Sequence, residues 1–223
     1  MQEESLLMDV IVDPHVVPHY VSYAFFASIL LIVIALILRG SLALVPKGLQ
    51  NFVEVMVESL YKLAEDNIGH HWGRYFFPLI GTIGLYVLVC NFMGLIPGFT
   101  APTSNINTTA SIAVPVFLAT HYYGIRVHGI KYIKHFLGPV MWLAPMMLVI
   151  ELIGHLVRPV TLSVRLFGNM VAKHMILFAL AIIAPIVIPV AILGLGVLVS
   201  LIQAFVSVLL TSLYLAGSVE EAH

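Results

Sequence analysis

Long runs of apolar residues, separated by short polar segments, make up most of the chain after Tyr20. An α-helix of about 20 apolar residues crosses the roughly 30 Å hydrocarbon core of a bilayer. Five runs of about this length predict five membrane-spanning helices, at residues 20–38, 76–97, 108–125, 139–172 and 188–216. Because the fourth run is too long for a perpendicular crossing, we expect the last two helices to be long and tilted.

The segment 46–68 has a different pattern, in which apolar and charged residues alternate with helical spacing. Its apolar members are Leu49, Phe52, Val53, Val55, Met56, Leu60 and Leu63, and its charged members are Lys47, Glu54, Glu58, Lys62, Glu65 and Asp66. This pattern is typical of an amphipathic helix that lies at the membrane surface. The sequence therefore predicts an all-α, polytopic membrane protein that forms one membrane domain over residues 1–223.

The basic residues predict the orientation of the chain, because short cytoplasmic loops are enriched in lysine and arginine. Residues 1–19 contain four acidic residues and no lysine or arginine. The basic residues flank the surface helix or follow the third span: Arg39, Lys47, Lys62, Arg74, Arg126, Lys131 and Lys134. We therefore expect the segment 1–19 and the loop 97–107 to be external, and the tail 218–223 to be cytoplasmic.

The composition argues against a water-soluble protein. Hydrophobic residues make up 61% of the 223 residues and charged residues only 9%, whereas soluble domains carry about 25% charged residues. The formal net charge of -1 provides no basic surface for nucleic acid. The single cysteine, Cys90, lies in an apolar run and is interpreted as a packing residue.

Five polar residues of the fourth run fall on one face of the predicted helix. Glu151, His155, Arg158, Arg165 and Asn169 follow one another at intervals of four, three, seven and four residues, which keeps neighbours within about 60° around a helix. An ionisable side chain within a membrane is costly unless it is paired, hydrated or functional. Arg158 also fits a side chain whose charged end reaches the membrane surface.

Arg165 is the residue of this face that is hardest to explain by structure alone. Its neighbours Val164 and Leu166 are apolar. The only carboxylate on the same face, Glu151, lies roughly 21 Å away along the helix. We therefore expect Arg165 to meet a carboxylate of another subunit or a water-filled cavity.

The last run also has a polar face, with residues at intervals of three or four: Ser200, Gln203, Ser207, Thr211, Tyr214 and Ser218. The serine and threonine hydroxyls fit helix contacts or hydrogen bonds to their own backbone. Gln203 differs, because its own helix cannot satisfy a primary amide. We expect Gln203 to face the fourth run and to pair with Arg165 or with water.

Two further polar sites lie away from Arg165. His174 follows Arg165 by nine residues, on the opposite side of the same helix, where it fits a structural histidine or a titrating group of a proton path. The loop before the third span carries Asn105 and Asn107. These side chains fit a helix cap or the lining of an external aqueous entrance.

The segment Pro159–Met170 reads Pro-Val-Thr-Leu-Ser-Val-Arg-Leu-Phe-Gly-Asn-Met and resembles the arginine motif of subunit a of F-type ATP synthases. The stretches 91–97, 102–108 and 201–221 are similar to the same family, so the resemblance covers most of the chain beyond Phe76. It implies a stator subunit in the inner membrane of a bacterial cell, with no catalytic residue, metal or cofactor of its own. It also implies proton rather than sodium transport.

The resemblance implies roles for several residues. Arg165 matches the essential arginine of the family, and Gln203 matches the glutamine of the adjoining helix. Asn169 and Glu151 match positions of the proton path. The helix pair 139–216 is then expected to form the ion pathway.

The same resemblance places Asn105 and Asn107 at the external one of two aqueous half-channels. It implies as partners a rotor ring of small hairpin subunits, each with a membrane carboxylate, together with peripheral-stalk subunit b and the lipid bilayer. Two positions depart from the family pattern. His174 stands where some bacterial members have glutamate, and Gly196 stands at a position that is often titratable.

Two other classes of protein remain as alternatives. A secondary transporter normally shows inverted repeats and discontinuous helices, and neither is visible in the sequence. Ten histidines suggest a haem or metal protein, although most of them lie in loops or near the termini. The chain has no G-x-x-x-x-G-K phosphate-binding motif, so we expect nucleotide chemistry to belong to other subunits.

Overall fold

The computed structural model describes residues 18–40, 42–43, 45–96, 99–129, 132, 144–181 and 187–219. In this part the elements are α1 (His19–Gly40), α2 (Leu49–Ile68), α3 (His70–Met93), the 3-10 helix η2 (Pro102–Ser104), α4 (Ile106–His128), α6 (Ala144–Ala181) and α7 (Val187–Val219). The prediction of an all-α membrane protein is confirmed. The expectations for residues 1–17, 139–143 and 220–223, and for Lys131 and Lys134, fall outside the described residues.

Four helical segments are long and apolar enough to cross a membrane: α1, α3, Pro145–Leu177 of α6 and Ile192–Val219 of α7. The third predicted span, residues 108–125, forms the 23-residue helix α4. It is less apolar than the other four because it carries polar residues such as Thr109, Thr120 and His121.

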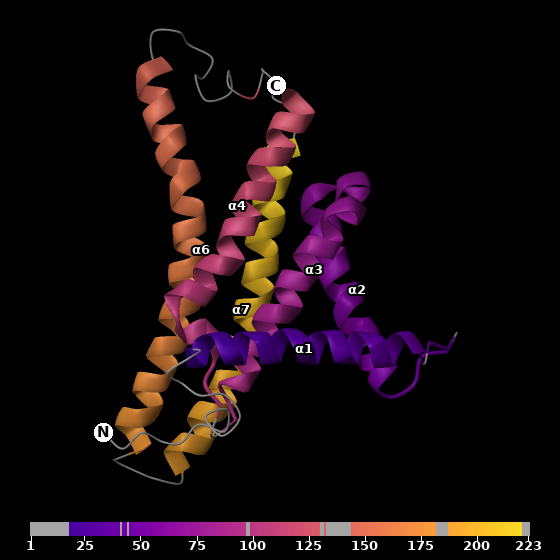
Figure 1. Cartoon of the computed structure of the whole chain (residues 1–223), viewed down its shortest axis with the longest axis vertical. Helices are drawn as coiled ribbons and strands as arrows, with labels where there is room; N and C mark the ends of the chain where they lie inside the picture. Colours follow the sequence, from indigo (N-terminus) through magenta and orange to yellow (C-terminus); the bar gives the residue numbers. More distant parts are fainter. Residues whose placement is uncertain are drawn as a thin grey trace.

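The long helices do not form a simple parallel bundle. Figure 1 shows α4, α6 and α7 running in broadly similar directions, with α1 lying crosswise to them. α7 contacts α2, α3, α4 and α6 and is the central element of the fold.

The main core lies where α3, α4 and α6 meet, with α7 packed against it. Its buried members are Ile83, Val87, Ile112, Ala113, Val116, Leu162 and Leu166. Leu162 and Leu166 are each 1% exposed, and they flank Arg165 in the sequence. The core therefore fixes the segment of α6 that carries Arg165.

The predicted amphipathic helix forms as α2, and its apolar residues serve two surfaces. Ala64 is fully buried against α3 and α7, whereas Phe52 is 66% exposed. On the exposed polar side, a hydrogen bond between Glu58 and Lys62 at 2.8 Å lowers the pKa of the Glu58 carboxyl and raises the pKa of Lys62. The exposed apolar side chains are suited to lipid, as expected of a helix at the membrane surface.

Gly69 makes the connection between α2 and α3. Its φ of 88° lies in a region that residues with a Cβ rarely adopt. The chain therefore reverses from α2 into α3 at a single non-helical residue.

Candidate functional site

Arg165 lies near the middle of α6, and its side chain is only partly exposed. It forms no ion pair with any residue that the structure describes. Large apolar side chains of α6 and α7 surround this region and remain about half exposed: Val160, Val164, Leu198, Leu201, Ile202 and Phe205. Arg165 is thus a positive charge within an apolar surface, without a counter-charge from the described residues.

Asn169 and Gln203 join α6 to α7 one helical turn beyond Arg165. The Nδ2 group of Asn169 donates a hydrogen bond to Oε1 of Gln203 at 2.6 Å. Gln203 is 5% exposed, and its Nε2 group has no hydrogen-bond partner among the described residues. Gln203 faces α6 as predicted, but its partner in this chain is Asn169 and not Arg165.

A cavity of about 200 Å³ opens beside this hydrogen bond, between α6 and α7. Asn169, Lys173 and Gly196 line it together with Ala172, Ile176, Ile192, Leu195 and Val199. The Nζ group of Lys173 is buried and has no hydrogen-bond partner among the described residues. A cavity of this size has room for water that would solvate the ammonium group.

Gly196 allows Lys173 to occupy this place. A Cβ at position 196 would lie 2.6 Å from Cδ2 of Leu95 and 3.3 Å from Cδ of Lys173. Gly196 departs from the family pattern in the sequence, but its packing against Lys173 could not be predicted from the sequence. A lysine in an apolar helix was the available signal, whereas the contact across helices was not visible in the sequence.

His174 lies away from this cavity, as its position around α6 predicts. Its Nδ1 is 2.9 Å from the carbonyl oxygen of Met170, and because a carbonyl only accepts, Nδ1 carries the hydrogen. The ring also has a backbone hydrogen-bond contact with Gly94, at the end of α3. This geometry fits both interpretations of His174, structural and proton-transferring.

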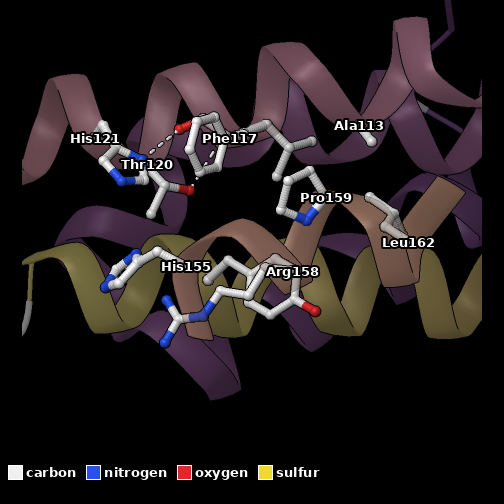
Figure 2. Close-up of a pocket in the computed structure, with 10 residues that line it drawn as sticks. Ala113, Phe117, Thr120, His121, His155, Arg158, Pro159 and Leu162 are labelled. Atoms are coloured by element: carbon white, nitrogen blue, oxygen red, sulfur yellow. Dashed lines mark hydrogen bonds between the residues drawn. The ribbon is translucent and has the colours of Figure 1, made fainter. Parts of the chain in front are cut away.

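A second polar cluster lies on the other side of Arg165 along α6. Nε2 of His155 is 3.3 Å from Oε1 of Glu151, and the ring of His155 is 5.1 Å from that of His121 on α4. The guanidinium carbon of Arg158 lies 5.5 Å from the ring centre of Tyr214 on α7, a cation–π contact. Figure 2 shows His121, His155 and Arg158 around one small cavity. The sequence did not indicate a role for His121.

Asn105 and Asn107 lie together at the start of α4. The side chain of Asn105 accepts a hydrogen bond from the backbone nitrogen of Asn107 at 2.9 Å and so caps the helix. The exposed side chain of Asn107 donates to the hydroxyl of Tyr20 on α1 at 3.4 Å. The helix-cap interpretation is confirmed for Asn105.

The hydroxyl groups along α7 bond to their own backbone. Ser200 donates to the oxygen of Gly196 at 2.7 Å, and Ser207 donates to that of Gln203 at 2.8 Å. Thr211 bonds its own helix in the same way. The expectation that these hydroxyl groups bond to their own backbone is confirmed. Two other members of this face contact α6: Gln203 by its hydrogen bond to Asn169, and Tyr214 through the ring that lies against Arg158.

The fold and these residues together define an α-helical membrane protein whose two longest helices carry two separate polar clusters. Between these clusters along α6 lies Arg165, which forms no ion pair within the described part of the chain. Such buried polar groups within membrane helices mark ion or proton pathways.

Comparison with known proteins specifies this class. The family model described as "ATP synthase A chain" matches residues 21–216. Proteins named "ATP synthase subunit a" from Trichlorobacter lovleyi and Geobacter sulfurreducens are 51% and 49% identical to the chain, and each alignment covers 91% of this chain and 88% of the relative. An "ATP synthase subunit a 1" from Pelobacter propionicus is 51% identical over the same share.

The chain belongs to the ATP synthase subunit a family. It is a multi-pass, non-catalytic subunit of the membrane sector of an ATP synthase, and it takes part in ATP synthesis through proton transport.

Proposed function

We propose that this chain is the stator subunit that exchanges protons with the carboxylates of a rotor ring through two aqueous half-channels. Arg165 is the residue that drives the exchange. The observation that carries the proposal is that Arg165 has no ion pair with any described residue of its own chain, although it lies within an apolar surface. Its counter-ion is then a carboxylate that another subunit brings to it.

The physical basis is a change in the environment of the rotor carboxylate. A carboxylate that faces lipid is protonated, because desolvation disfavours its charged form. At about 4 Å from Arg165 and an effective dielectric constant near 20, attraction favours the ionised form by about 4 kcal/mol. This corresponds to about three pKa units, so the proton leaves.

An arginine suits this role better than a lysine, since its guanidinium group stays charged even where it is poorly hydrated. The fixed charge also repels a proton that would otherwise pass directly between the two half-channels. A proton that enters from one side must therefore travel with the ring before it leaves on the other side.

The two polar clusters support the two half-channels. One lies around Glu151, and the other lies around Asn169, Gln203 and Lys173 with its cavity of about 200 Å³. They are on opposite sides of Arg165 in the sequence of α6.

Three further residues belong to the proposed proton path. Asn105 and Asn107 line its external entrance, which a helix cap does not preclude. His174 is assigned to the path because an imidazole ring can take up and release a proton near neutral pH.

The remaining partners and the orientation belong to the same proposal. The exposed apolar surface around Arg165 faces a ring of small hairpin subunits, and peripheral-stalk subunit b attaches elsewhere on the chain. Residues 1–223 act as one membrane domain in the inner membrane of a bacterial cell. The N-terminus is external and the C-terminus is cytoplasmic.

The direct test is the substitution Arg165→Ala in the complete ATP synthase. We expect ATP-driven proton pumping in membrane vesicles to be abolished while the complex still assembles, because no other group can ionise the rotor carboxylate. Arg126→Ala, at the exposed end of α4, is the matched control and is expected to pump normally. Normal coupling in the Arg165→Ala complex would refute the proposal.

A further inference from the structure

Two histidines from different helices meet where α4 packs against α6. The ring centres of His121 and His155 are 5.1 Å apart, and their planes make an angle of 71°. His155 is 7% exposed. Figure 2 shows the two rings turned toward each other across the contact between the helices.

The hydrogen bonds of the two rings define where each can take up a proton. Nδ1 of His121 is 2.9 Å from the carbonyl oxygen of Phe117, so Nδ1 carries a hydrogen and neutral His121 accepts a proton at Nε2. Nε2 of His155 is 3.3 Å from Oε1 of Glu151. A proton can therefore move between the carboxyl group of Glu151 and the ring of His155.

The surroundings favour one mobile proton rather than two. The titratable and charged groups around the two rings are Glu151 and Arg158 from α6, Tyr214 from α7, and Tyr132, whose ring centre is 6.3 Å from that of His121. Two imidazolium charges at this distance repel each other, and Arg158 adds to the repulsion. The carboxylate of Glu151 offsets only one of these positive charges.

Both rings also line a cavity of about 10 Å³ together with Arg158 and Tyr214. This volume is close to the minimum for one water molecule. A single bridging water is thus sterically possible between groups that exchange protons.

We propose that Glu151, His155 and His121 form a proton relay that links the region of Arg165 to the aqueous phase on one side of the membrane. The relay rests on the proposed function, because it supplies one of the two half-channels. A proton that arrives from the side of Arg165 is taken up by the ring of His155, directly or from Nε2 of His121, and His155 passes a proton from Nε2 to the carboxylate of Glu151. Glu151, which lies farthest from Arg165 along α6, releases that proton to the aqueous phase. Each group ends with the protons it had at the start, and the reverse sequence serves the opposite direction.

The test uses the complete ATP synthase in membrane vesicles and measures ATP-driven proton uptake. We expect His121→Gln and His155→Gln each to lower the rate at least about tenfold; this threshold is conservative, because a positioned proton-transfer group typically contributes about a hundredfold or more. The double variant should be no slower than the slower single variant, because both residues act in one path. His128→Gln, on the same helix as His121, is the matched control and should leave the rate unchanged.

Chemical rescue separates proton transfer from packing. Imidazole added to the His121→Gly or His155→Gly complex should restore a measurable part of the rate, because it replaces the lost ring without restoring helix contacts. If the complexes with the His155 variants do not assemble, the His121 variants provide the test, because His121 is only partly buried. Rates equal to the unmodified complex, rate losses that multiply in the double variant, or failure of imidazole to restore any flux would each overturn the relay.

The Arg165→Ala complex distinguishes the two proposals. If Arg165→Ala pumps normally, the proposed function itself fails. If Arg165→Ala is inactive and the histidine variants pump normally, the proposed function stands and the relay alone is wrong.

Discussion

The three lysine and arginine residues of α6 lie in three different environments. Arg158 lies against the ring of Tyr214, Lys173 places its ammonium group beside a cavity, and Arg165 has no ion pair among the described residues. Sequence spacing predicted that Arg165 is far from any acid of its own helix face, because distance along a helix follows from residue number alone. It predicted neither the stacking of Arg158 nor the cavity at Lys173, since both depend on α7.

Gln203 gives a prediction at this scale. Gln203→Leu removes the acceptor of the Asn169 hydrogen bond, which contributes about 0.5–1.5 kcal/mol. We expect proton flux in reconstituted vesicles to fall by about two- to tenfold without being eliminated.

Ser207→Ala is the control for this substitution. Ser207 is also buried on α7, but it bonds only its own backbone, so its loss should leave flux nearly unchanged. Equal flux in the Gln203→Leu, Ser207→Ala and unmodified complexes would reduce Gln203 to a packing residue.

At the scale of elements, the apolar runs located the helices but not their ends. α3 begins at His70 rather than at residue 76, and α4 ends at His128 rather than at residue 125. Hydropathy marks the part of a helix that suits lipid, whereas backbone hydrogen bonds continue through polar residues such as Arg74. The cap at Asn105 and the reversal at Gly69 mark the true ends, because they depend on local backbone geometry.

Close contact between α3 and α7 gives a second prediction. A Cβ added to Gly84 would lie 2.4 Å from Cγ2 of Val208, a fully buried residue. Gly84→Ala should therefore destabilise the packing by about 1–3 kcal/mol, as overpacked cores do. The measurement is the thermal inactivation midpoint of the purified complex, and Val208→Ala in the same chain should reverse part of the loss.

Gly217 provides the comparison for Gly84. It also lies within a helix, but a Cβ there meets nothing within 4 Å. Gly217→Ala should keep the midpoint of the unmodified complex. If the Gly84→Ala complex has the same inactivation midpoint as the unmodified complex, α3 and α7 are farther apart at this position than the distance of 2.4 Å to Val208 implies.

At the scale of the whole molecule, the arrangement of the helices determines how the chain meets the membrane. Only 11% of the most apolar part of α1 is buried inside the molecule, compared with 50% for α3. α1 thus leaves most of its surface for lipid or for other subunits, whereas its own chain covers about half of the corresponding part of α3. α1 lies crosswise to α6 and α7 (Figure 1).

The proposed orientation gives a third prediction. Cysteines placed at the exposed positions Lys47 and Ile106 should react with a membrane-impermeant maleimide from opposite sides, with Lys47→Cys labelled from the cytoplasmic side. The native Cys90 is fully buried and should not react, so the labelling is readily assigned. Labelling of both engineered cysteines from one side would refute the orientation.

The sequence by itself determined the α-helical membrane class, the approximate helices, the family and the isolation of Arg165 on its helix face. These features depend on local hydropathy, on residue spacing and on a contiguous motif. The tertiary structure decided which groups meet across helices: Asn169 with Gln203, Lys173 with Gly196, and His121 with His155. Such pairs are far apart in the chain, and they form only because side-chain packing fixes the rotation and offset of one helix against another.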